Sequence, residues 1–314
     1  MKKFDMAMLG AININLALRP VDKSMFERDV TRISDFGMTL GGDAMNEAIT
    51  AAHLDNRVLL CGKVGDDAFG SQVLRQAQQH GIDISGVVRG KGECTAVGTQ
   101  LISERGDRRI VSFRGAIESY VLEEVPMDLI RQAAILSIGS FNMLKCLEGP
   151  GITAILREAK NAGLITSADT MSDTYGFSFE LLKPHFPYLD YFIPSYEEAV
   201  TMSGERKPAR IAAFFRKLGC GNVVIKMGAD GCYIQNNQFD AAIAACPTRP
   251  IDTTGAGDNF VAGFLTAVKQ GMDLLAAARY GNAVAAISVQ HMGSSGAIQS
   301  VEQVDQYRKQ MNYE

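Results

Sequence analysis

The chain has 314 residues, of which 46% are hydrophobic and 21% are charged. At roughly 150 residues per domain, this length allows two domains or one large α/β domain, and the apolar content excludes global disorder. Lys and Arg number 31 against 35 Asp and Glu, a formal net charge of −4. That balance gives no electrostatic case for nucleic acid or an anionic membrane, although a few backbone amides can still bind a small anion.

The cysteines, histidines and N-terminal residues indicate a cytoplasmic protein. The six cysteines form no CxxC pair and the four histidines no HxH or HExxH pattern, so we expect neither a zinc site nor a disulfide framework. The apolar start contains Asp5 and lacks a signal-peptide exit, and it predicts a first strand at residues 4–10. No apolar run is long enough to span a membrane.

Short apolar runs alternate with helix-period segments. Strands are predicted at residues 57–61, 134–138, 164–168, 190–193 and 222–226. Helices are predicted at residues 44–53, 69–80, 151–162, 196–203 and 209–218. This alternation is typical of a doubly wound, mostly parallel sheet with helices on both faces.

Residues 11–40 and 84–115 interrupt this alternation. Both contain extended stretches of mixed polarity, and the second predicts a hairpin from residues 95–102 and 109–114. Such segments suit a small sheet, either as a flap beside a ligand cleft or as a plain extension of an edge.

The segment DTTGAGD at residues 252–258 precedes two apolar helices predicted at residues 259–270 and 274–290. Small residues before a helix start let backbone amides bind an anion such as phosphate. Asp258 then has two interpretations: an acid that caps the helix, or a base that accepts a proton from a hydroxyl attacking phosphorus. The chain lacks GxxxxGK[ST], a helix-opening GxGxxG and the HRD and DFG motifs, which disfavours P-loop, nicotinamide-binding and protein-kinase functions.

A second cluster, GGDAMNEA, occupies residues 41–48 and is followed by GKVGDDAFG at residues 62–70. Alone, it fits either close approach to a ligand or a simple helix entry with a buried Asn46. Together with DTTGAGDNFVAGF, about two hundred residues later, it resembles the ribokinase-like (PfkB) carbohydrate kinases along the whole chain. The resemblance implies one kinase domain over residues 1–314, in which residues 11–40 and 84–115 form a lid over the sugar.

The resemblance also implies transfer of the γ-phosphoryl group of Mg-ATP to a sugar hydroxyl. By the family's motifs, Asp258 is the base, and the amides of Gly255, Ala256 and Gly257 form the anion hole. The matching sugar-binding positions are Gly41, Gly42, Asp43, Asn46 and Asn15. Asn15 stands where the family commonly has Asp, and Asp43 disfavours a carboxylated sugar unless an arginine such as Arg114 offsets it.

Further positions match the family's nucleotide and ion sites. The nucleotide side comprises Ser195, Lys226, Gly228, Gly231 and Asn282. Glu198 matches a position that helps to bind Mg²⁺ through water. The alternative for Glu198 is an exposed helix acid, and the alternative for Lys226 is a surface lysine. Asp252, Thr254 and Gly293 match positions that hold a monovalent cation, such as K⁺, in many members.

The same sequence features are compatible with other functions. A sugar or nucleotide sensor that performs no catalysis would use the same fold. A nucleoside kinase would need stacking partners, for which Phe113 and Phe141 are candidates. A sugar-phosphate kinase would need basic lid residues, for which Arg105, Arg108, Arg109 and Arg114 are candidates. A lid with one apolar face also predicts a homodimer formed through the lids.

Overall fold

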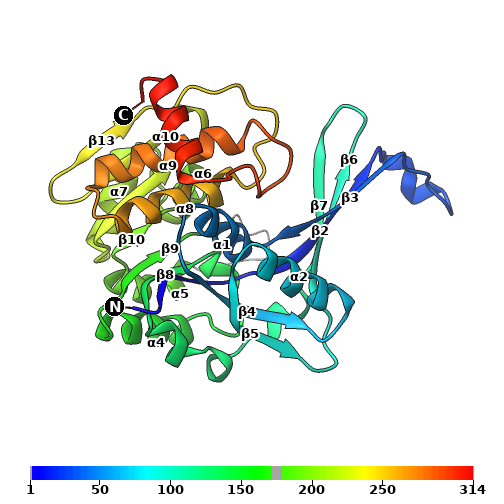
Figure 1. Ribbon diagram of the computed structural model, residues 1–314, viewed down its shortest axis with the longest axis horizontal. Helices are drawn as coiled ribbons and strands as arrows, with labels where there is room; N and C mark the ends of the chain where they lie inside the picture. Colours follow the sequence, from blue (N-terminus) through cyan, green and yellow to red (C-terminus); the bar gives the residue numbers. More distant parts are fainter. Residues whose placement is uncertain (1, 172–178, 314) are drawn as a thin grey trace.

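The structure, a computed structural model, describes residues 2–171 and 179–313. Its body is a nine-stranded sheet with the order β13-β12-β11-β10-β9-β8-β1-β4-β5 (Figure 1). The parallel strands are β1 (Phe4–Leu9), β4 (Val58–Gly65), β5 (Asp83–Gly90), β8 (Ala133–Ile138), β9 (Ile165–Ala168), β10 (Tyr191–Phe192) and β11 (Asn222–Lys226). The antiparallel β12 (Cys232–Gln235) and β13 (Asp240–Ile243) extend one edge. The predicted doubly wound α/β class is confirmed.

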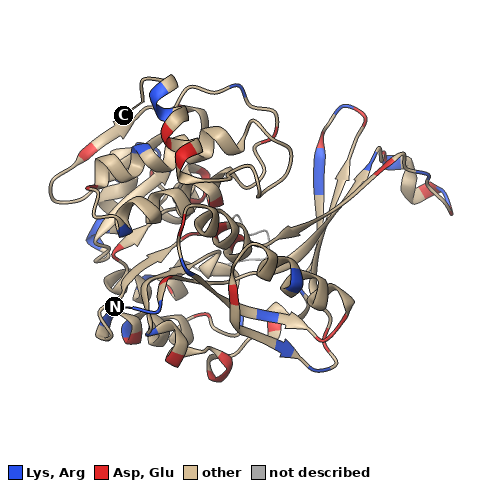
Figure 2. Cartoon of the chain, viewed as in Figure 1, with Lys and Arg blue, Asp and Glu red and all other residues tan. Residues whose placement is uncertain are grey.

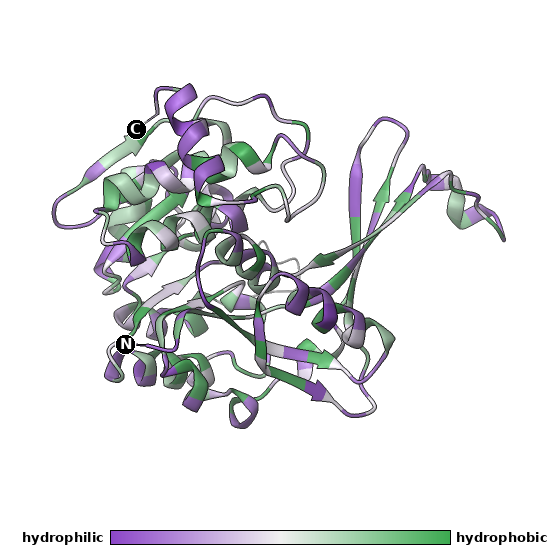
Figure 3. Cartoon of the chain, in the orientation of Figure 1, coloured by the Kyte–Doolittle hydropathy of each residue, from purple (hydrophilic) through white to green (hydrophobic). Residues whose placement is uncertain are grey.

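Helices cover both faces of this sheet. They are α1 (Asp43–His53), α2 (Ala68–Gln79), α3 (Met127–Ile130), α4 (Pro150–Asn161), α5 (Phe179–Leu182), α6 (Tyr196–Ser203), α7 (Pro208–Lys217), α8 (Ala256–Lys269), α9 (Leu274–Ser288) and α10 (Val301–Gln310). Among the helices of the described ranges, none is both long and apolar enough to cross a bilayer. In Figure 3 the surface helix α10 is mostly hydrophilic, whereas the strands of the large sheet are mostly hydrophobic.

The alternation of side chains along β1 explains the two hydrophobic cores. Met6 and Met8 belong to the core that contains residues of α1, α2, α8 and α9, while Ala7 and Leu9 belong to the core on the other face, with residues of α4 and α7. All four side chains are 0% exposed. A strand buried on both faces reads as a continuous apolar run, which is the pattern seen in the sequence.

A separate four-stranded sheet, here called the lid, projects from the body (Figure 1). Its order is β3-β2-β6-β7, from β3 (Asp35–Gly41), β2 (Asn13–Arg19), β6 (Ala96–Ile102) and β7 (Arg108–Phe113). One part of the expected lid segment 84–115 differs, because β5 pairs with β4 in the large sheet. Ile84 and Val87 of β5 pack against the body's core, which fixes the strand there.

The register gives the lid two unlike faces. On one face, Asn15 lies between Thr39 of β3 and Gly98 of β6, and Gly98 pairs with Ser112 of β7. The other face is apolar, and its large side chains are substantially exposed: Phe36 (59%), Met38 (41%), Val111 (58%) and Phe113 (55%). A sheet with one polar and one apolar face is a surface suited to a ligand on the first and a partner on the second.

Candidate active site

The candidate site lies at the carboxyl ends of the parallel strands. The neighbours β1 and β8 mark the switch point, because the chain proceeds from β1 to β4 and β5 on one side and from β8 to β11 on the other. Ligands of open α/β sheets bind outside such a point. Asp169 directly follows β9, Ser195 closely follows β10, and Lys226 ends β11, so their side chains gather at this edge.

Three glycines bring the base of the lid close to α1. Gly42 is the N-cap of α1 with φ +91°, and a Cβ there would lie 2.2 Å from the carbonyl oxygen of Ala11. Asn15 fills the space beside Gly41 and Gly98, since a Cβ on either would lie within 2.8 Å of its amide group. Asn15 Oδ1 accepts a 2.8 Å hydrogen bond from Asn13 Nδ2. The structure therefore brings Asn15, Gly41 and Gly42 together.

Asp258 lies in the first turn of α8, because the helix begins at Ala256, earlier than the predicted residue 259. Its N-cap is Gly255, so Asp258 does not cap the helix. Asp258 Oδ2 accepts a 2.6 Å hydrogen bond from Asn46 Nδ2, and Asn46 Oδ1 accepts a 3.0 Å bond from Ser294 Oγ. Burial raises the pKa of Asp258 to about 6, although the Asn46 hydrogen bond and Lys226 act to lower it. A carboxylate with this pKa can accept a proton near neutral pH.

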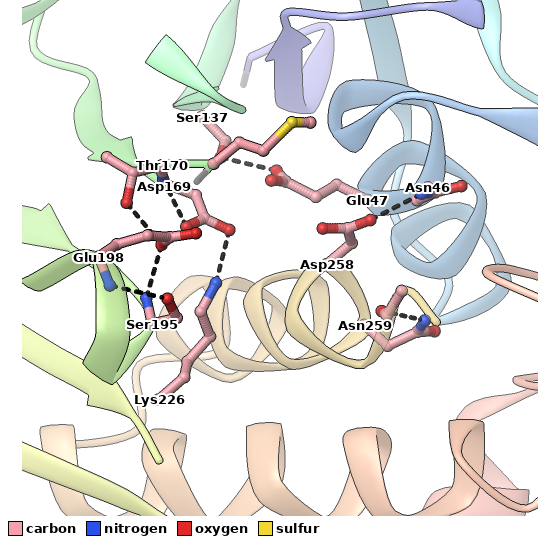
Figure 4. A network of polar contacts seen from close by, with 12 residues as sticks. Asn46, Glu47, Ser137, Asp169, Thr170, Ser195, Glu198, Lys226, Asp258 and Asn259 are labelled. Atoms are coloured by element: carbon pink, nitrogen blue, oxygen red, sulfur yellow. Dashed lines mark hydrogen bonds and ion pairs between the residues drawn. The ribbon is translucent and has the colours of Figure 1, made fainter. Parts of the chain in front are cut away.

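Figure 4 shows Asp258 close to polar side chains from α1, β8, α6 and β11 and from the segment that follows β9. Lys226 Nζ lies 2.6 Å from Asp169 Oδ2, and the two side chains are only 12% and 3% exposed. Burial raises the pKa of Asp169 to about 7 against the lowering effect of Lys226. Burial acts to lower the pKa of Lys226, but Asp169 and Glu198 outweigh it and raise this pKa. The plainer reading of Lys226 as a surface lysine is wrong.

Two further acids stand one helical turn apart on α1. Glu47 is 0% exposed, and its Oε2 accepts a 2.8 Å hydrogen bond from Ser137 Oγ. Burial, followed by Asp169 and Asp258, raises the pKa of Glu47 well above its usual range. Burial and the same two carboxylates raise that of Asp43 as well. Burial thus disfavours the charged form of both acids.

The loop before α8 makes a tight turn at Gly255, and the amide of Ala256 in this turn donates to the carbonyl oxygen of Thr253 at 3.2 Å. Gly255 has φ +72°, and a Cβ there would lie 2.3 Å from the carbonyl oxygen of Ser294. Asp252 holds the loop, since its Oδ1 accepts from Thr254 N (3.0 Å) and Thr254 Oγ1 (2.7 Å) and its Oδ2 accepts from Gly293 N (2.9 Å). These bonds outweigh the opposite effect of burial and lower the pKa of Asp252. The structure thus brings Asp252, Thr254 and Gly293 together.

A cavity of about 430 Å³ opens beside this loop. Its lining is mostly apolar and includes the predicted nucleotide and anion-hole positions Lys226, Gly228, Gly231, Asn282, Ala256 and Gly257. A Cβ on Gly257 would lie 3.2 Å from Lys226 Nζ, so the ammonium group borders the anion hole. Asn282 is tied to the cavity wall through Ala244 O (3.2 Å) and Tyr313 Oη (2.9 Å). The shape and polarity fit an aromatic base at one end and phosphates at the other.

Ser195 and Glu198 form a capping box at the start of α6. Ser195 Oγ accepts from Glu198 N at 3.4 Å, and Glu198 Oε2 accepts from Ser195 N at 2.9 Å and from Thr170 Oγ1 at 2.8 Å. Glu198 is therefore a fixed acid beside Asp169 and Lys226 rather than a free surface acid. No cluster of three or more Asp, Glu, His or Cys side chains in the described chain is arranged to hold a metal. A Mg²⁺ ion that keeps its water shell and binds phosphate oxygens fits this arrangement.

The sugar-binding role of Arg114 stays a prediction: its guanidinium group donates to the carbonyl oxygen of Met143, in the segment after β8, contacts Met143 Sδ at 3.5 Å and lies 3.6 Å from Glu118. Other residues lie in other places than the sequence suggested, or were missed. Phe141 is 0% exposed in the core, and Phe113 lies on the apolar lid face, so neither is placed for stacking in the cleft. Asp169 and Glu47 were missed. The available signals were a carboxylate directly after a buried strand, and an acid one turn after Asp43.

Comparison with known proteins agrees with this architecture. The family model for "pfkB family carbohydrate kinase" matches residues 3–300. The 2-dehydro-3-deoxygluconokinase of Bacillus subtilis is 27% identical over 294 residues, 87% of each chain. Among solved structures, the ribokinase of Thermotoga maritima has a TM-score of 0.85 at 24% identity and covers 98% of this chain and 99% of its own. The Arabidopsis thaliana ribokinase complexed with ribose and ATP has a TM-score of 0.84 at 19% identity, with coverage of 98% and 99%. The chain belongs to the pfkB family of carbohydrate kinases.

Proposed function

We propose that this kinase transfers the γ-phosphoryl group of ATP to a hydroxyl of a sugar, with Asp258 as the general base. One observation carries the proposal: Asp258 stands in the first turn of α8, close to the amides at the start of that helix, and its Oδ2 lies 2.6 Å from Asn46 Nδ2. A base and an anion hole on adjacent residues serve the two ends of one reaction, since the base takes the hydroxyl proton and the amides stabilise the transferred group.

The sugar would lie between the polar lid face and the start of α1. Asn15, Gly41 and Gly42 meet there, and Asn46 connects this region with Asp258. The lid would exclude water, which otherwise competes with the sugar as phosphoryl acceptor. The carboxyl groups of Asp43 and Glu47 lie on this side, and a sugar acid or a sugar phosphate would bring further negative charge close to them. We therefore expect a neutral sugar.

ATP would occupy the cavity beside α8 and α9, since the Arabidopsis thaliana ribokinase of the same fold is complexed with ribose and ATP. Asn282 and the apolar lining would surround the base, and Lys226 would neutralise phosphate charge from beneath Gly257. Glu198, held by Ser195 and Thr170, would orient a water of the Mg²⁺ shell. The ion, when bound, supplies charge neutralisation on the phosphates.

A monovalent cation is part of the proposal. Asp252, Thr254 and Gly293 already form one hydrogen-bonded unit directly behind Gly255. K⁺ bound at this unit would stiffen the loop that carries the anion hole. The test is turnover with K⁺ against the same ionic strength of tetramethylammonium. Equal rates in the two salts would remove the cation from the mechanism.

We also propose a homodimer through the apolar lid face. A two-fold axis would bring Phe36, Met38, Val111 and Phe113 of two copies together, and would bury a patch that a lone chain exposes. Val111 and Ile110 are neighbours on opposite faces of β7 with 58% and 59% exposure, so they make a matched pair. Sedimentation equilibrium should show a dimer that Val111→Asp dissociates and Ile110→Asp leaves intact; a monomeric wild type would contradict the proposal.

The activity is tested by ADP release with Mg-ATP over a panel of sugars, sugar acids, sugar phosphates and nucleosides. We expect turnover on a neutral sugar. Turnover only on another class would keep the kinase and overturn the acceptor assignment. A sugar that shifts the melting temperature without ADP release would favour the sensor, the second function that the fold allows.

A further inference from the structure

Arg108, at the start of β7, reaches from the lid to the loop before α8. One guanidinium nitrogen, Nη1, donates to the hydroxyl oxygen of Thr254, which stands 146 residues away in the sequence. Figure 2 shows the basic start of β7 at the far end of the lid strand. The contact joins the lid, on the proposed sugar side, with the residue that directly precedes the anion hole.

From this contact we propose that Arg108 is a phosphate-contacting residue: when the lid covers the site, its guanidinium group binds the terminal phosphoryl group of the nucleotide. The inference rests on the proposed phosphoryl transfer and adds a residue to it. Neither the PfkB motifs quoted above nor the apolar cavity beside α8 includes Arg108.

The pleat of β7 determines which arginine faces the site. Gly98 pairs with Ser112, Gln100 with Ile110, and Ile102 with Arg108, so Arg108 shares the face of Ser112 and, through Gly98, of Asn15. Arg109 pairs with Leu101 and therefore belongs to the apolar face. The two adjacent arginines thus have the same charge and opposite orientations.

The hydrogen bond to the neutral hydroxyl of Thr254 uses one of the N–H donors of Arg108 and, among the described residues, gives its charge no ion-pair partner. Thr254 Oγ1 donates its proton to Asp252 Oδ1 at 2.7 Å, so it can only accept from Arg108. A guanidinium group carries five N–H donors in a planar fork that matches phosphate oxygens. In the described chain, the contact with Thr254 is the side-chain hydrogen bond that Arg108 makes. The remaining donors stand next to the loop whose amides form the anion hole.

The acidic residues around the site are the reason that an additional positive charge would help to bind a phosphate there. Asp43, Glu47, Asp169 and Asp258 all lie near the transfer point and affect one another's pKa. Lys226 is a buried cation beside them, and Asp169 already pairs with it. A second side-chain cation would therefore add to the neutralisation that Lys226 and a Mg²⁺ ion give a terminal phosphate. Arg108 is exposed on the lid, so the lid delivers this charge as it covers the site.

In the transfer, the sugar oxygen forms a bond to the γ-phosphorus while the bond from that phosphorus to the β,γ-bridging oxygen breaks. The hydroxyl proton passes to Asp258, and ADP leaves with the bonding electrons. Arg108 would hold non-bridging oxygens of the moving group from the lid side, and Lys226 would hold them from the side of the body. A contact of this kind is specific to the third phosphate.

The test compares Arg108→Ala, Arg108→Lys and the matched control Arg109→Ala by calorimetric binding of Mg-ADP and of the non-hydrolysable Mg-β,γ-imido-ATP, each with the sugar that supports turnover or, failing one, without sugar. A lost hydrogen bond to a charged group is worth about 1.5–3 kcal/mol, which is a factor of roughly 10–100. We expect Arg108→Ala to weaken the binding of imido-ATP by that factor and the binding of ADP by less than twofold. Arg108→Lys should recover part of the lost affinity for imido-ATP. Arg109→Ala should change the affinity for neither nucleotide.

Equal losses for ADP and imido-ATP, or binding by Arg108→Ala that matches Arg109→Ala, would overturn the assignment. Circular dichroism melts confirm that each variant is folded, and Arg108→Lys keeps the test decisive if the alanine variant is not. The two proposals fail separately. If the wild type shows no turnover but Arg108→Ala still lowers the preference for imido-ATP over ADP, the proposed transfer alone is contradicted. If the wild type is active and Arg108→Ala binds both nucleotides as the wild type does, this inference alone is contradicted.

Discussion

Asn46 of α1 donates a hydrogen bond of 2.6 Å from Nδ2 to Oδ2 of Asp258 in α8, across 212 positions of sequence. The amide is 5% exposed, and its oxygen accepts from Ser294 Oγ, so the donor cannot turn away without losing two bonds. One side chain thereby couples the glycine-rich start of α1 with the acid at the start of α8. The bond stabilises the ionised form of Asp258 and acts against the burial that raises its pKa to about 6.

Removal of this bond should move the pH dependence of the reaction. In Asn46→Ala the ionised form of Asp258 loses a donor, so its pKa rises further and the acidic limb of the kcat/KM profile shifts upward by about one pH unit. The variant therefore loses more activity at pH 6 than at pH 8. The control is Thr50→Val, which removes another bond between α1 and α8, the one to Asn259 Oδ1. If the pH profile of Asn46→Ala has the same shape as that of the wild type, the acidic limb does not report the pKa of Asp258.

Replacement of the proposed base should abolish catalysis and spare binding. Asp258→Asn keeps the size of the side chain and removes its ability to accept the hydroxyl proton, so turnover should fall by a factor of at least ~100. Mg-ATP affinity, measured by calorimetry, should stay within a few-fold of the wild type because the amides of α8 remain. Turnover close to normal would show that another group takes the proton.

The loop before α8 should not tolerate a side chain at Gly255. An alanine there adopts φ +72° and places Cβ 2.3 Å from Ser294 O. The control is Gly271→Ala, which has φ +82° but no atom within 4 Å of the new Cβ. Urea unfolding should show a loss of about 1–2 kcal/mol for Gly271→Ala from backbone strain and a clearly larger loss for Gly255→Ala. Equal losses in the two variants would mean that the loop yields to the new methyl group.

The buried acids should make stability depend on pH. The folded pKa of Glu47 lies well above that of the unfolded chain, so its unfavourable effect is absent at low pH and grows as the pH rises from about 4.5 to the folded pKa. Glu47→Gln carries no proton to lose. Its free energy of unfolding should therefore exceed that of the wild type by more at pH 8 than at pH 5, as measured by urea titration. Exposed Glu302→Gln is the control, and an equal difference at both pH values would contradict the raised pKa.

The elements that rest on short-range periodicity were predicted well. The helix at residues 196–203 and the strand at residues 222–226 coincide with α6 and β11. The alternation of strands and helices gave the fold class, because a buried parallel strand must be apolar on both faces wherever it lies in the sheet. Element boundaries were predicted less well. The helix expected from residue 259 starts at Ala256, because Gly255, in the left-handed region, can serve as its N-cap without a side chain.

Two glycine-rich motifs were enough to predict the family, because close backbone approach and helix entry require their residue types. The same motifs and the strand at residues 222–226 marked Asp258 and Lys226 as candidates. Four relationships became visible in the folded chain alone: the ion pair of Lys226 with Asp169, the place of Glu47 in the acidic group, the pairing of β5 within the large sheet and the contact of Arg108 with Thr254. These relationships join residues far apart in the chain. They are set by how helices and strands pack, and the composition or spacing of a local segment carries no record of its distant neighbours.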